Sequence, residues 1–376
     1  MCGFVIRNLM KKKKVLVAMS GGVDSSTAAF LLQKKGYEVM GVFMRLDDKH
    51  GLAEAAARQV CDHLGIKFYP VNLSAKFKKE IINYFVDSYK KGLTPNPCVK
   101  CNQLIKFGEL LRIASELDCE YLATGHYTRL RREFPISLPR RQAGNFPASP
   151  AGGQFPIKML RAKDDSKDQT YFLYNLTQKQ LKKILFPLGE YKKEDIKKIA
   201  KKEKLPVLKS ESQDVCFLNI DGKIIEHNDY LKKYIKKNPG PIKTIDGKII
   251  GKHQGLPFYT IGQRRGVEIG GTGPYYVVRT DYITNTLYVS TNHDDPELYK
   301  KELIAKDVNW LAGIQSKMPL KCEAVIRYRH KAVKCKISSK NGKYLVKFDK
   351  PQRAVAPGQS VVFYRGEELL GGGIIS

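Results

Sequence analysis

Short apolar runs alternate with stretches of helical spacing through the first half of the chain. The apolar runs predict buried β-strands at residues 15–18, 38–43, 67–71 and 121–123. The helical spacing predicts one helix that ends at Gly36 and further helices over residues 53–64, 75–90, 102–117, 171–185 and 191–204. Strands that alternate with helices indicate an α/β fold whose parallel sheet is covered on both faces. In such sheets ligands bind at the carboxyl ends of the strands.

Two later stretches depart from this pattern. Residues 134–156 contain five prolines and almost no periodic apolar positions, which predicts a mobile and dispensable insertion in a loop. From about Pro241, short alternating runs separated by Gly, Pro and Asp turns predict small all-β modules of barrel type. We therefore expect a parallel-sheet domain over residues 12–218, a small β-rich central domain over 219–292 and a C-terminal β-barrel over 293–376.

The charge balance adds an expected partner. The 376 residues include 66 Lys and Arg against 37 Asp and Glu, a formal net charge of +29. Such a surplus attracts polyanions, and the release of counterions from phosphates adds affinity for nucleic acid. The lysines of the predicted helix over 191–204 form either a solvated face or an RNA-facing stripe. No apolar run approaches the roughly 20 residues that span a bilayer, so we expect no membrane partner and a cytoplasmic location.

A glycine-rich turn follows the first predicted strand and opens a helix. Its sequence is Ser20-Gly-Gly-Val-Asp-Ser-Ser26. Gly21 and Gly22 permit a tight turn that brings backbone N–H groups near an anion, and the helix N-terminus adds positive potential. Asp24 is a candidate ligand for a Mg²⁺ ion that bridges phosphates. The Gly-Lys-Ser/Thr ending of a Walker A motif is absent, so the turn predicts a phosphate cradle of another kind.

Three cysteines are candidates for chemistry. Cys98 and Cys101 are two residues apart just before a predicted helix, whose N-terminus is expected to lower a thiol pKa. Cys216 lies in a polar loop that enters a short strand. The spacing leaves open a redox pair, half of a metal site or simple packing, and without a second CxxC a four-cysteine zinc site is disfavoured. Four further cysteines lie in apolar surroundings and are expected in the core: Cys61, Cys119, Cys322 and Cys335.

Taken in order, these segments resemble one family. Over nearly all of residues 14–376 the chain is similar to the bacterial tRNA-specific 2-thiouridylases, members of the PP-loop ATP pyrophosphatase superfamily. The matching strings are Ala18–Ser26, Gly41–Met44, Thr94–Asn102, Ala123–Tyr127, Ser166–Leu173, Asp214–Phe217, His253–Leu256, Thr260–Arg264, Arg327–Arg329, Pro357–Ser360 and Gly371–Gly373.

The resemblance implies ATP- and Mg²⁺-dependent 2-thiolation of the wobble uridine of tRNA. It implies that the C2 oxygen is adenylated, that Cys216 carries sulfur as a persulfide, and that Cys101 attacks this persulfide and leaves a Cys101–Cys216 disulfide. The implied ATP-binding residues are Ala18, Met19, Ser20, Gly21, Gly22, Val23, Asp24, Ser25, Met44 and Gly125. The implied tRNA contacts are Asn96, Pro97, Cys98, His126, Lys167, Asp168, Gln169, Arg327, Tyr328 and Gln359. The implied partners are tRNAs for Glu, Gln and Lys and a sulfur donor, either a cysteine desulfurase or a persulfide relay protein.

The chain departs from the family pattern at two places. Many members have Asp, a proposed acid/base group, at the position of Cys98, and residues 134–156 have no counterpart. Members with Cys there have been suggested to hold a 4Fe-4S cluster, whose ligands here would be Cys98, Cys101 and Cys216. The persulfide relay and the cluster both stay open. Another PP-loop tRNA-modifying activity, or a non-enzymatic RNA-binding protein with a degenerate loop, is an alternative hypothesis.

Overall fold

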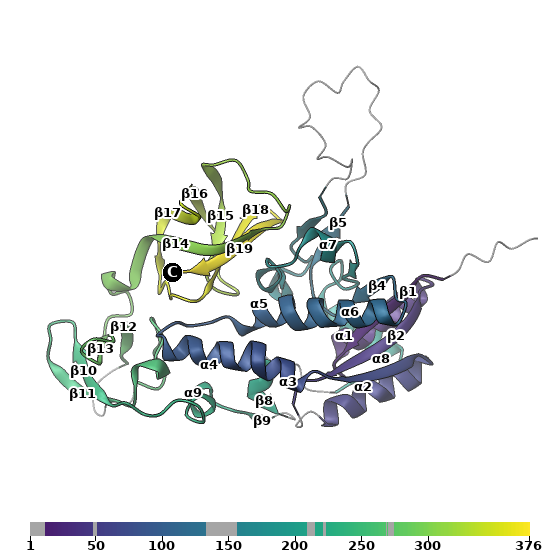
Figure 1. Cartoon of the computed structure of the whole chain (residues 1–376), viewed down its shortest axis with the longest axis horizontal. Coiled ribbons are helices and arrows are strands. Elements are labelled where there is room, and N and C mark those ends of the chain that lie inside the picture. The colour runs from purple at the N-terminus through teal and green to yellow at the C-terminus, as the bar shows by residue number, and fades with distance from the viewer. Residues whose placement is uncertain are drawn as a thin grey trace, which may run out of the picture.

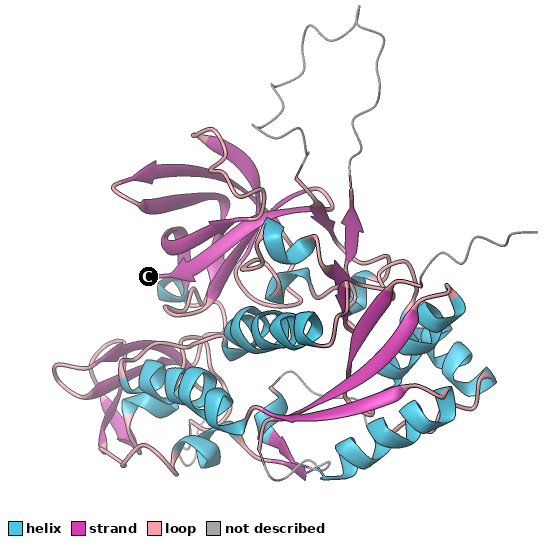
Figure 2. Cartoon of the chain, turned by 45° about the vertical axis from the view of Figure 1, so that its right-hand side comes forward, coloured by secondary structure: helices cyan, strands magenta, loops and turns pink. Residues whose placement is uncertain are grey.

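The computed structural model describes residues 12–47, 51–132, 156–208, 215–220, 223–267, 269 and 274–376. Its described part is built on three large β-sheets and one two-stranded ribbon (Figure 1). The first two sheets follow one another along the chain, and the third combines C-terminal strands with two strands from the first half. Helices gather around the first sheet, whereas the two later sheets carry few (Figure 2). Within this part, no helix has both the length and the apolar character that crossing a membrane requires.

The first sheet is parallel and has the strand order β3-β2-β1-β4-β7. Its strands are β1 (Lys14–Met19), β2 (Glu38–Arg45), β3 (Lys67–Asn72), β4 (Tyr121–Ala123) and β7 (Ile184–Leu185). Val15, Leu16 and Val17 of the central strand are all fully buried. Because successive side chains point to opposite faces of a strand, both faces of this sheet are covered, as the sequence predicted.

Helices from two parts of the chain cover these faces. Helices α1 (Val23–Lys34) and α2 (Gly51–Leu64) pack on the face that carries Val15. The opposite face packs against two longer helical segments. The first comprises α3 (Ser74–Phe77), a π-helical stretch (Lys78–Ile82) and α4 (Asn83–Lys90), and the second comprises α5 (Pro97–Cys101), a π-helical stretch (Asn102–Glu109) and α6 (Leu110–Glu116).

The prediction of a helix over residues 171–185 is wrong. Only α7 (Gln178–Leu181) is α-helical there, and it begins at a capping box formed by Thr177 and Gln180. Before it, the chain runs through buried turns whose carbonyl groups have a partner far away in the sequence. The Asn309 amide donates to the carbonyl oxygens of Tyr174 (2.6 Å) and Leu176 (3.1 Å). After it, β7 adds an unpredicted fifth strand to the sheet.

The second half of the chain is β-rich, as predicted. A ribbon of β8 (Asn219–Ile220) and β9 (Lys223–Ile224) and helix α9 (His227–Leu231) precede the second sheet. That sheet has the order β11-β10-β13-β12. Its strands are β10 (Gly240–Thr244), β11 (Ile249–His253), β12 (Tyr276–Asp281) and β13 (Thr286–Ser290).

Six C-terminal strands form a closed barrel. They run in the order β14-β17-β16-β15-β18-β19, and β14 also pairs with β19, which closes the ring. The strands are β14 (Tyr299–Trp310), β15 (Leu320–Val325), β16 (Val333–Lys340), β17 (Lys343–Arg353), β18 (Ser360–Arg365) and β19 (Glu368–Ile375). Closure removes the exposed strand edges that an open sheet would present.

A hairpin from the first half of the chain extends this barrel sheet. Strands β5 (Arg129–Arg131) and β6 (Lys158–Leu160) pair with each other, and β6 pairs with β19 of the barrel. The predicted insertion at residues 134–156 lies between these strands and falls outside the described residues except for Pro156, so its mobility stays a prediction. The hairpin couples the nucleotide-loop half of the molecule to the barrel.

Candidate active site

The glycine-rich turn lies between the end of β1 and the start of α1. Gly21 has a positive φ of 74°, and a Cβ atom built there would lie 2.6 Å from the carbonyl oxygen of Ala53, so only glycine fits. Gly22 is the N-cap of α1 and no side chain caps the helix, which leaves the first-turn N–H groups able to bind an anion. The Ser20 N–H donates to Ser25 Oγ at 3.1 Å and fixes the turn.

A second close approach completes this cradle. A Cβ atom on Gly125, which follows β4, would lie 2.8 Å from the backbone nitrogen of Ser25. The two loops therefore meet without room for any side chain between them. The tenth residue expected to bind ATP, Gly21, lies against α2 instead of lining the cavity. The other nine line one large cavity: Ala18, Met19, Ser20, Gly22, Val23, Asp24, Ser25, Met44 and Gly125.

Asp24 is held by two donors on the cavity wall. Both of its carboxylate oxygens accept from the Lys193 ammonium at 2.7 Å, and one also accepts from the Tyr127 hydroxyl at 2.7 Å. The Asp24 side chain is still 34% exposed. Among the described residues it is the only carboxylate that lines the cavity. Since Mg²⁺ is usually held by one or two carboxylates together with substrate phosphates, Asp24 fits the expected ion.

The three candidate cysteines line the same cavity as the glycine-rich turn. Cys101 is buried, Cys98 is half-buried and Cys216 is exposed, and all three are free thiols. Burial raises the pKa of the Cys101 thiol to about 12, an effect that the Lys106 ammonium partly opposes. The prediction that a helix N-terminus lowers this pKa is wrong, because Cys101 lies at the end of the short helix α5 and the cost of desolvation is larger.

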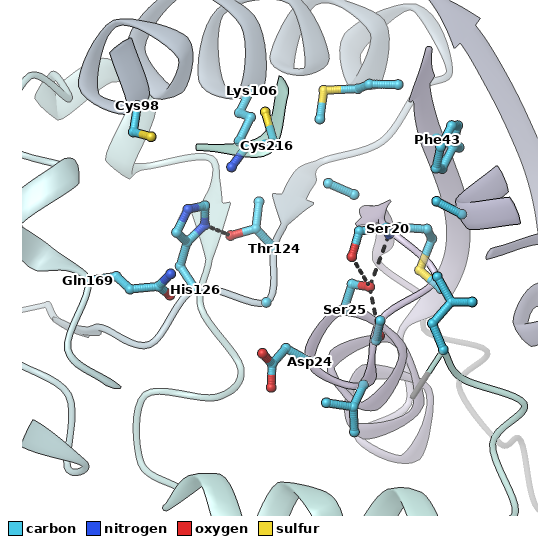
Figure 3. A pocket seen from close by; sticks show the side chains of 18 of the residues that line it. Ser20, Asp24, Ser25, Phe43, Cys98, Lys106, Thr124, His126, Gln169 and Cys216 are labelled. Atoms are coloured by element: carbon cyan, nitrogen blue, oxygen red, sulfur yellow. Dashed lines mark hydrogen bonds between the residues drawn. The ribbon is translucent and has the colours of Figure 1, made fainter. Parts of the chain in front are cut away.

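Lys106 extends into the cavity beside Cys216 (Figure 3). Although Cys216 is exposed on the cavity wall, desolvation by the surrounding protein raises the pKa of its thiol. The Lys106 ammonium is the largest influence in the opposite direction. No motif in the sequence singles out Lys106. Lys106 lies in the π-helical stretch Asn102–Glu109. The wider turn of a π-helix changes the direction of the side chain five residues after Cys101, and here that side chain lines the cavity.

The three cysteines do not form a metal site in this arrangement. The described residues, which include all three, contain no group of three or more His, Cys, Asp or Glu side chains placed to hold a metal. Cys98 and Cys216 belong to different elements, and Figure 3 shows the Lys106 side chain between them. As placed here, the thiols therefore do not fit a shared 4Fe-4S cluster.

The residues expected to contact tRNA fall into two groups. Five line the cavity and five do not. The cavity-lining group is Pro97, Cys98, His126, Gln169 and Tyr328, and the other group is Asn96, Lys167, Asp168, Arg327 and Gln359. The first group is placed to meet a base that enters the cavity, and the second lies in the surrounding loops.

Hydrogen bonds fix three of these residues. His126 Nδ1 lies 2.7 Å from Thr124 Oγ1, and burial lowers the pKa of the imidazole well below its ordinary value, so His126 is neutral at pH 7. The Asp168 carboxylate accepts from the Thr170 hydroxyl (2.6 Å) inside the protein. The Gln359 amide donates to the carbonyl oxygen of Thr94 (3.2 Å) and thereby ties the barrel to the loop before Cys98.

Thiol alkylation tests this arrangement without any substrate. We expect iodoacetamide to modify the exposed Cys216 before the buried Cys101 in the native protein, because access and thiolate content both govern the rate. The alkylation rate of Cys101 should keep rising with pH through pH 9, since its pKa of about 12 keeps the thiol protonated there. Peptide mass spectrometry measures both rates, and earlier modification of Cys101 would contradict the described burial.

A parallel sheet, an uncapped Ser-Gly-Gly-Val-Asp-Ser turn and adjacent thiols define a PP-loop enzyme of the ATP pyrophosphatase class. The profile described as a tRNA methyl transferase HUP domain matches residues 13–220. The tRNA methyl transferase PRC-barrel profile matches residues 228–291, and the aminomethyltransferase beta-barrel profile matches residues 300–375.

Curated relatives cover almost the whole chain. The tRNA-specific 2-thiouridylase MnmA of Geobacillus thermodenitrificans is 41% identical over 96% of this chain and 94% of its own length. Its namesake from Limosilactobacillus fermentum is 40% identical over 96% of this chain and 95% of its own. The tRNA-specific 2-thiouridylase MnmA of Yersinia pestis is 40% identical over 97% of this chain and 96% of its own length. The chain belongs to the tRNA-specific 2-thiouridylase family.

Proposed function

We propose that this protein is a tRNA-uridine 2-sulfurtransferase that uses ATP to place sulfur on C2 of the wobble uridine. The observation that carries the proposal is one cavity of about 840 Å³ lined by both the glycine-rich turn and the thiols Cys101 and Cys216. A nucleotide that activates the base and a sulfur that attacks it must meet at one carbon atom. A shared cavity supplies this proximity, which lowers the entropic cost of the reaction.

The first step is adenylation of the base. The uridine C2 oxygen attacks the α-phosphorus of ATP, the bond to the β-phosphate oxygen breaks, and pyrophosphate leaves. The uncapped N–H groups at the start of α1 and the residues around Gly125 hold the phosphates in this step. The residues at Asn96, Pro97 and Cys98 and the neutral His126 receive the base. Mg²⁺ bound at Asp24 would neutralise phosphate charge.

The second step transfers sulfur. Cys216, exposed on the cavity wall, accepts a sulfur atom from the donor and carries it as a persulfide. The outer sulfur adds to C2 and AMP leaves with the former C2 oxygen, while the Cys101 sulfur attacks Cys216 Sγ and breaks the persulfide bond. The products are 2-thiouridine, AMP and a Cys101–Cys216 disulfide, which a thiol reductant must reopen. Burial of Cys101 keeps it protonated until the second step.

The family profiles carry a different chemical description, since they name methyl transfer. Methyl transfer needs neither an ATP phosphate cradle nor a pair of thiols, and this cavity holds both. Sulfur transfer therefore explains both the phosphate cradle and the two thiols, whereas methyl transfer explains neither. The alternative sulfur route through a 4Fe-4S cluster requires Cys98, Cys101 and Cys216 to gather on one cluster, and iron and sulfide analysis of anaerobically purified protein decides it.

The partners follow from the same chemistry. The net charge of +29 supports binding of tRNA, and tRNAs for Glu, Gln and Lys are the proposed acceptors. A cysteine desulfurase or a persulfide relay protein is the proposed sulfur donor. We propose a cytoplasmic location. We also propose that the chain divides into a catalytic domain over residues 12–218, a small β-rich central domain over 219–292 and a tRNA-binding β-barrel over 293–376.

Pyrophosphate release tests the first step alone. With ATP, Mg²⁺ and unmodified tRNA but no sulfur source, the protein should release pyrophosphate only when tRNA is present. A non-enzymatic RNA-binding protein would release none, and a PP-loop enzyme with another substrate would not depend on the wobble uridine. Transcripts with cytidine at the wobble position serve as the matched control.

Lys106 provides a separate prediction for the second step. Replacing Lys106 with methionine removes the ammonium that opposes the raised pKa of both Cys101 and Cys216. We expect single-turnover sulfur transfer at pH 7.5 to fall about tenfold and to recover partly at higher pH. Lys100→Met is the matched control, because Lys100 lies over the Tyr84 ring (4.3 Å) and does not line the cavity. A pH profile unchanged by Lys106→Met would contradict the role.

A further inference from the structure

Arg161 comes directly after strand β6 and lies where the barrel meets the first half of the chain. Its N–H donates to the carbonyl oxygen of Glu367 (2.9 Å), in the turn between β18 and β19, and so continues the pairing of β6 with the barrel. Its guanidinium carbon lies 3.8 Å from the centroid of the Tyr364 ring. One guanidinium nitrogen lies 3.3 Å from a carboxylate oxygen of Asp168. Arg161 therefore joins the barrel to the loop that carries Asp168.

Asp168 is buried in spite of its charge, since its side chain is only 7% exposed. Its Oδ1 accepts from the Ala162 N–H at 3.0 Å, and its Oδ2 accepts from the Thr170 hydroxyl at 2.6 Å. The same hydroxyl lies 3.1 Å from that of Tyr364. Burial raises the pKa of the Asp168 carboxyl, and these hydrogen bonds and the Arg161 guanidinium oppose the shift. A buried carboxylate is tolerated only where such partners are present.

The family resemblance places Asp168 among the residues that contact tRNA, next to Gln169. Both carboxylate oxygens of Asp168 accept hydrogen bonds within the protein, and a carboxylate repels the phosphates of RNA. Gln169, by contrast, lines the cavity (Figure 3). A role in fixing the chain where Gln169 enters the cavity wall therefore suits Asp168 better than a contact with tRNA.

Two hydrogen bonds join Gln169 to Tyr127. The Gln169 N–H donates to the Tyr127 carbonyl oxygen at 3.0 Å, and the Tyr127 N–H donates to Gln169 Oε1 at 2.9 Å. The Tyr127 hydroxyl donates to Asp24 of the glycine-rich turn at 2.7 Å. The position of Gln169 is thus tied to the phosphate cradle on one side and, through Asp168, to Arg161 on the other.

The contacts of Arg161 are those of a fixed side chain. Its guanidinium is 24% exposed, lies over one ring and pairs with one carboxylate. Stacking and pairing at the same time is a property of the planar guanidinium that a lysine does not share. An arginine that serves mainly as a phosphate contact would keep this group directed at solvent. The geometry therefore favours an internal role.

We propose that Arg161 is a positioning residue for activation of the base: its guanidinium neutralises the buried Asp168 carboxylate and thereby fixes Gln169 on the cavity wall. The proposal rests on the proposed function, because the step that it serves is the adenylation. Arg161 acts through Asp168 and does not line the cavity. Without the guanidinium, the carboxylate is left buried and unpaired, so the loop must move to bring it to water.

A double-mutant cycle at Arg161 and Asp168 tests the proposal. Arg161→Met keeps a flexible side chain over the Tyr364 ring and removes the charge. The matched control is Lys158→Met, which removes the same charge from β6 at a side chain of similar exposure, 27% against 24%. Asp168→Asn and Arg161→Met/Asp168→Asn complete the set. Steady-state pyrophosphate release gives kcat and the KM for tRNA, and thermal unfolding confirms the fold.

We expect Arg161→Met to lower kcat about tenfold and to change the KM for tRNA by less than about twofold. The double variant should recover to within about threefold of wild type, because it no longer buries an unpaired charge. Lys158→Met should stay within about twofold on both constants. A raised KM with wild-type kcat in Arg161→Met would indicate a phosphate contact and overturn the proposal. A double variant no more active than Arg161→Met would also overturn it.

Hydrogen exchange measures the Arg161–Asp168 contact without turnover. Exchange of backbone amides over residues 164–170 should rise about tenfold in Arg161→Met and return toward the wild-type rate in the double variant. Unchanged exchange in Arg161→Met would overturn the proposal whatever the activity. A wild-type protein that releases no pyrophosphate with tRNA but shows this exchange pattern would overturn the proposed function and leave the contact standing.

Discussion

Replacing Cys216 with serine is expected to abolish 2-thiouridine formation while tRNA-dependent pyrophosphate release stays within about twofold of wild type. Serine keeps the size of the side chain but cannot carry a persulfide. The glycine-rich turn lies at another part of the same cavity, so adenylation proceeds without the thiol. Cys101→Ser is also expected to abolish 2-thiouridine formation while pyrophosphate release continues. In this variant the persulfide forms on Cys216, but no thiol attacks Cys216 Sγ to break its S–S bond. Nucleoside mass spectrometry and a pyrophosphate assay measure the two steps.

Two further cysteine variants make this result specific. Cys119→Ser is the control for general damage, because Cys119 is buried and does not line the cavity. Cys98→Ser separates the two sulfur routes: a relay between Cys216 and Cys101 still yields product, whereas a cluster on three cysteines loses a ligand. Full thiolation by Cys216→Ser would contradict the assigned sulfur carrier.

Replacing Gly125 with alanine is expected to lower pyrophosphate release about 100-fold. The new Cβ atom would lie 2.8 Å from the Ser25 nitrogen and 2.9 Å from the Asp24 carbonyl carbon, so the start of α1 must move. That displacement shifts the N–H groups that hold the phosphates. Because the step before sulfur transfer fails, thiolation should fall by the same factor, unlike the split expected for Cys216→Ser.

Gly51→Ala is the matched control for this substitution. A Cβ atom at Gly51, the first residue of α2, has no neighbour within 4 Å, so activity should stay at the wild-type level. Thermal unfolding of both variants distinguishes a displaced cradle from an unfolded protein. Wild-type pyrophosphate release by a folded Gly125→Ala variant would show that the contact between this loop and α1 does not position the phosphates.

Local patterns correctly predicted four of the five strands of the first sheet and the glycine-rich turn. Val15, Leu16 and Val17 form an unbroken apolar run, as a strand buried on both faces requires. Gly21 predicts a tight turn correctly, because few other residues adopt its positive φ of 74°. In both places the chemistry that fixes the structure lies within a few residues of sequence.

Structure that depends on distant partners could not be predicted in this way. The chain from Tyr171 to Leu176 has helical spacing of apolar residues, yet its carbonyl groups bond to Asn309 of the barrel. The pairing of β6 with β19 likewise joins segments separated by some two hundred residues. No local pattern encodes either partner, and tertiary contacts override helix propensity.

The candidate site shows the same limit. The resemblance selected Cys101 and Cys216, but not the burial that raises the pKa of Cys101. For the lysines of helix α8 (Lys193–Lys202), the sequence left solvent and RNA as alternatives. The structure adds a third environment for Lys197 and Lys201, because both line the cavity that also contains the glycine-rich turn. The spacing of four residues between Lys197 and Lys201 can be read from the sequence, but the cavity that they line cannot.

The most direct test of the central claim is mass spectrometry of tRNA nucleosides. Unmodified tRNA is incubated with the protein, ATP, Mg²⁺, a cysteine desulfurase and cysteine, then digested and analysed. We predict 2-thiouridine at the wobble position, formed only when ATP and the protein are both present, with one AMP released for each thiolated base. Absence of 2-thiouridine from a reaction in which the protein binds both ATP and tRNA would contradict it.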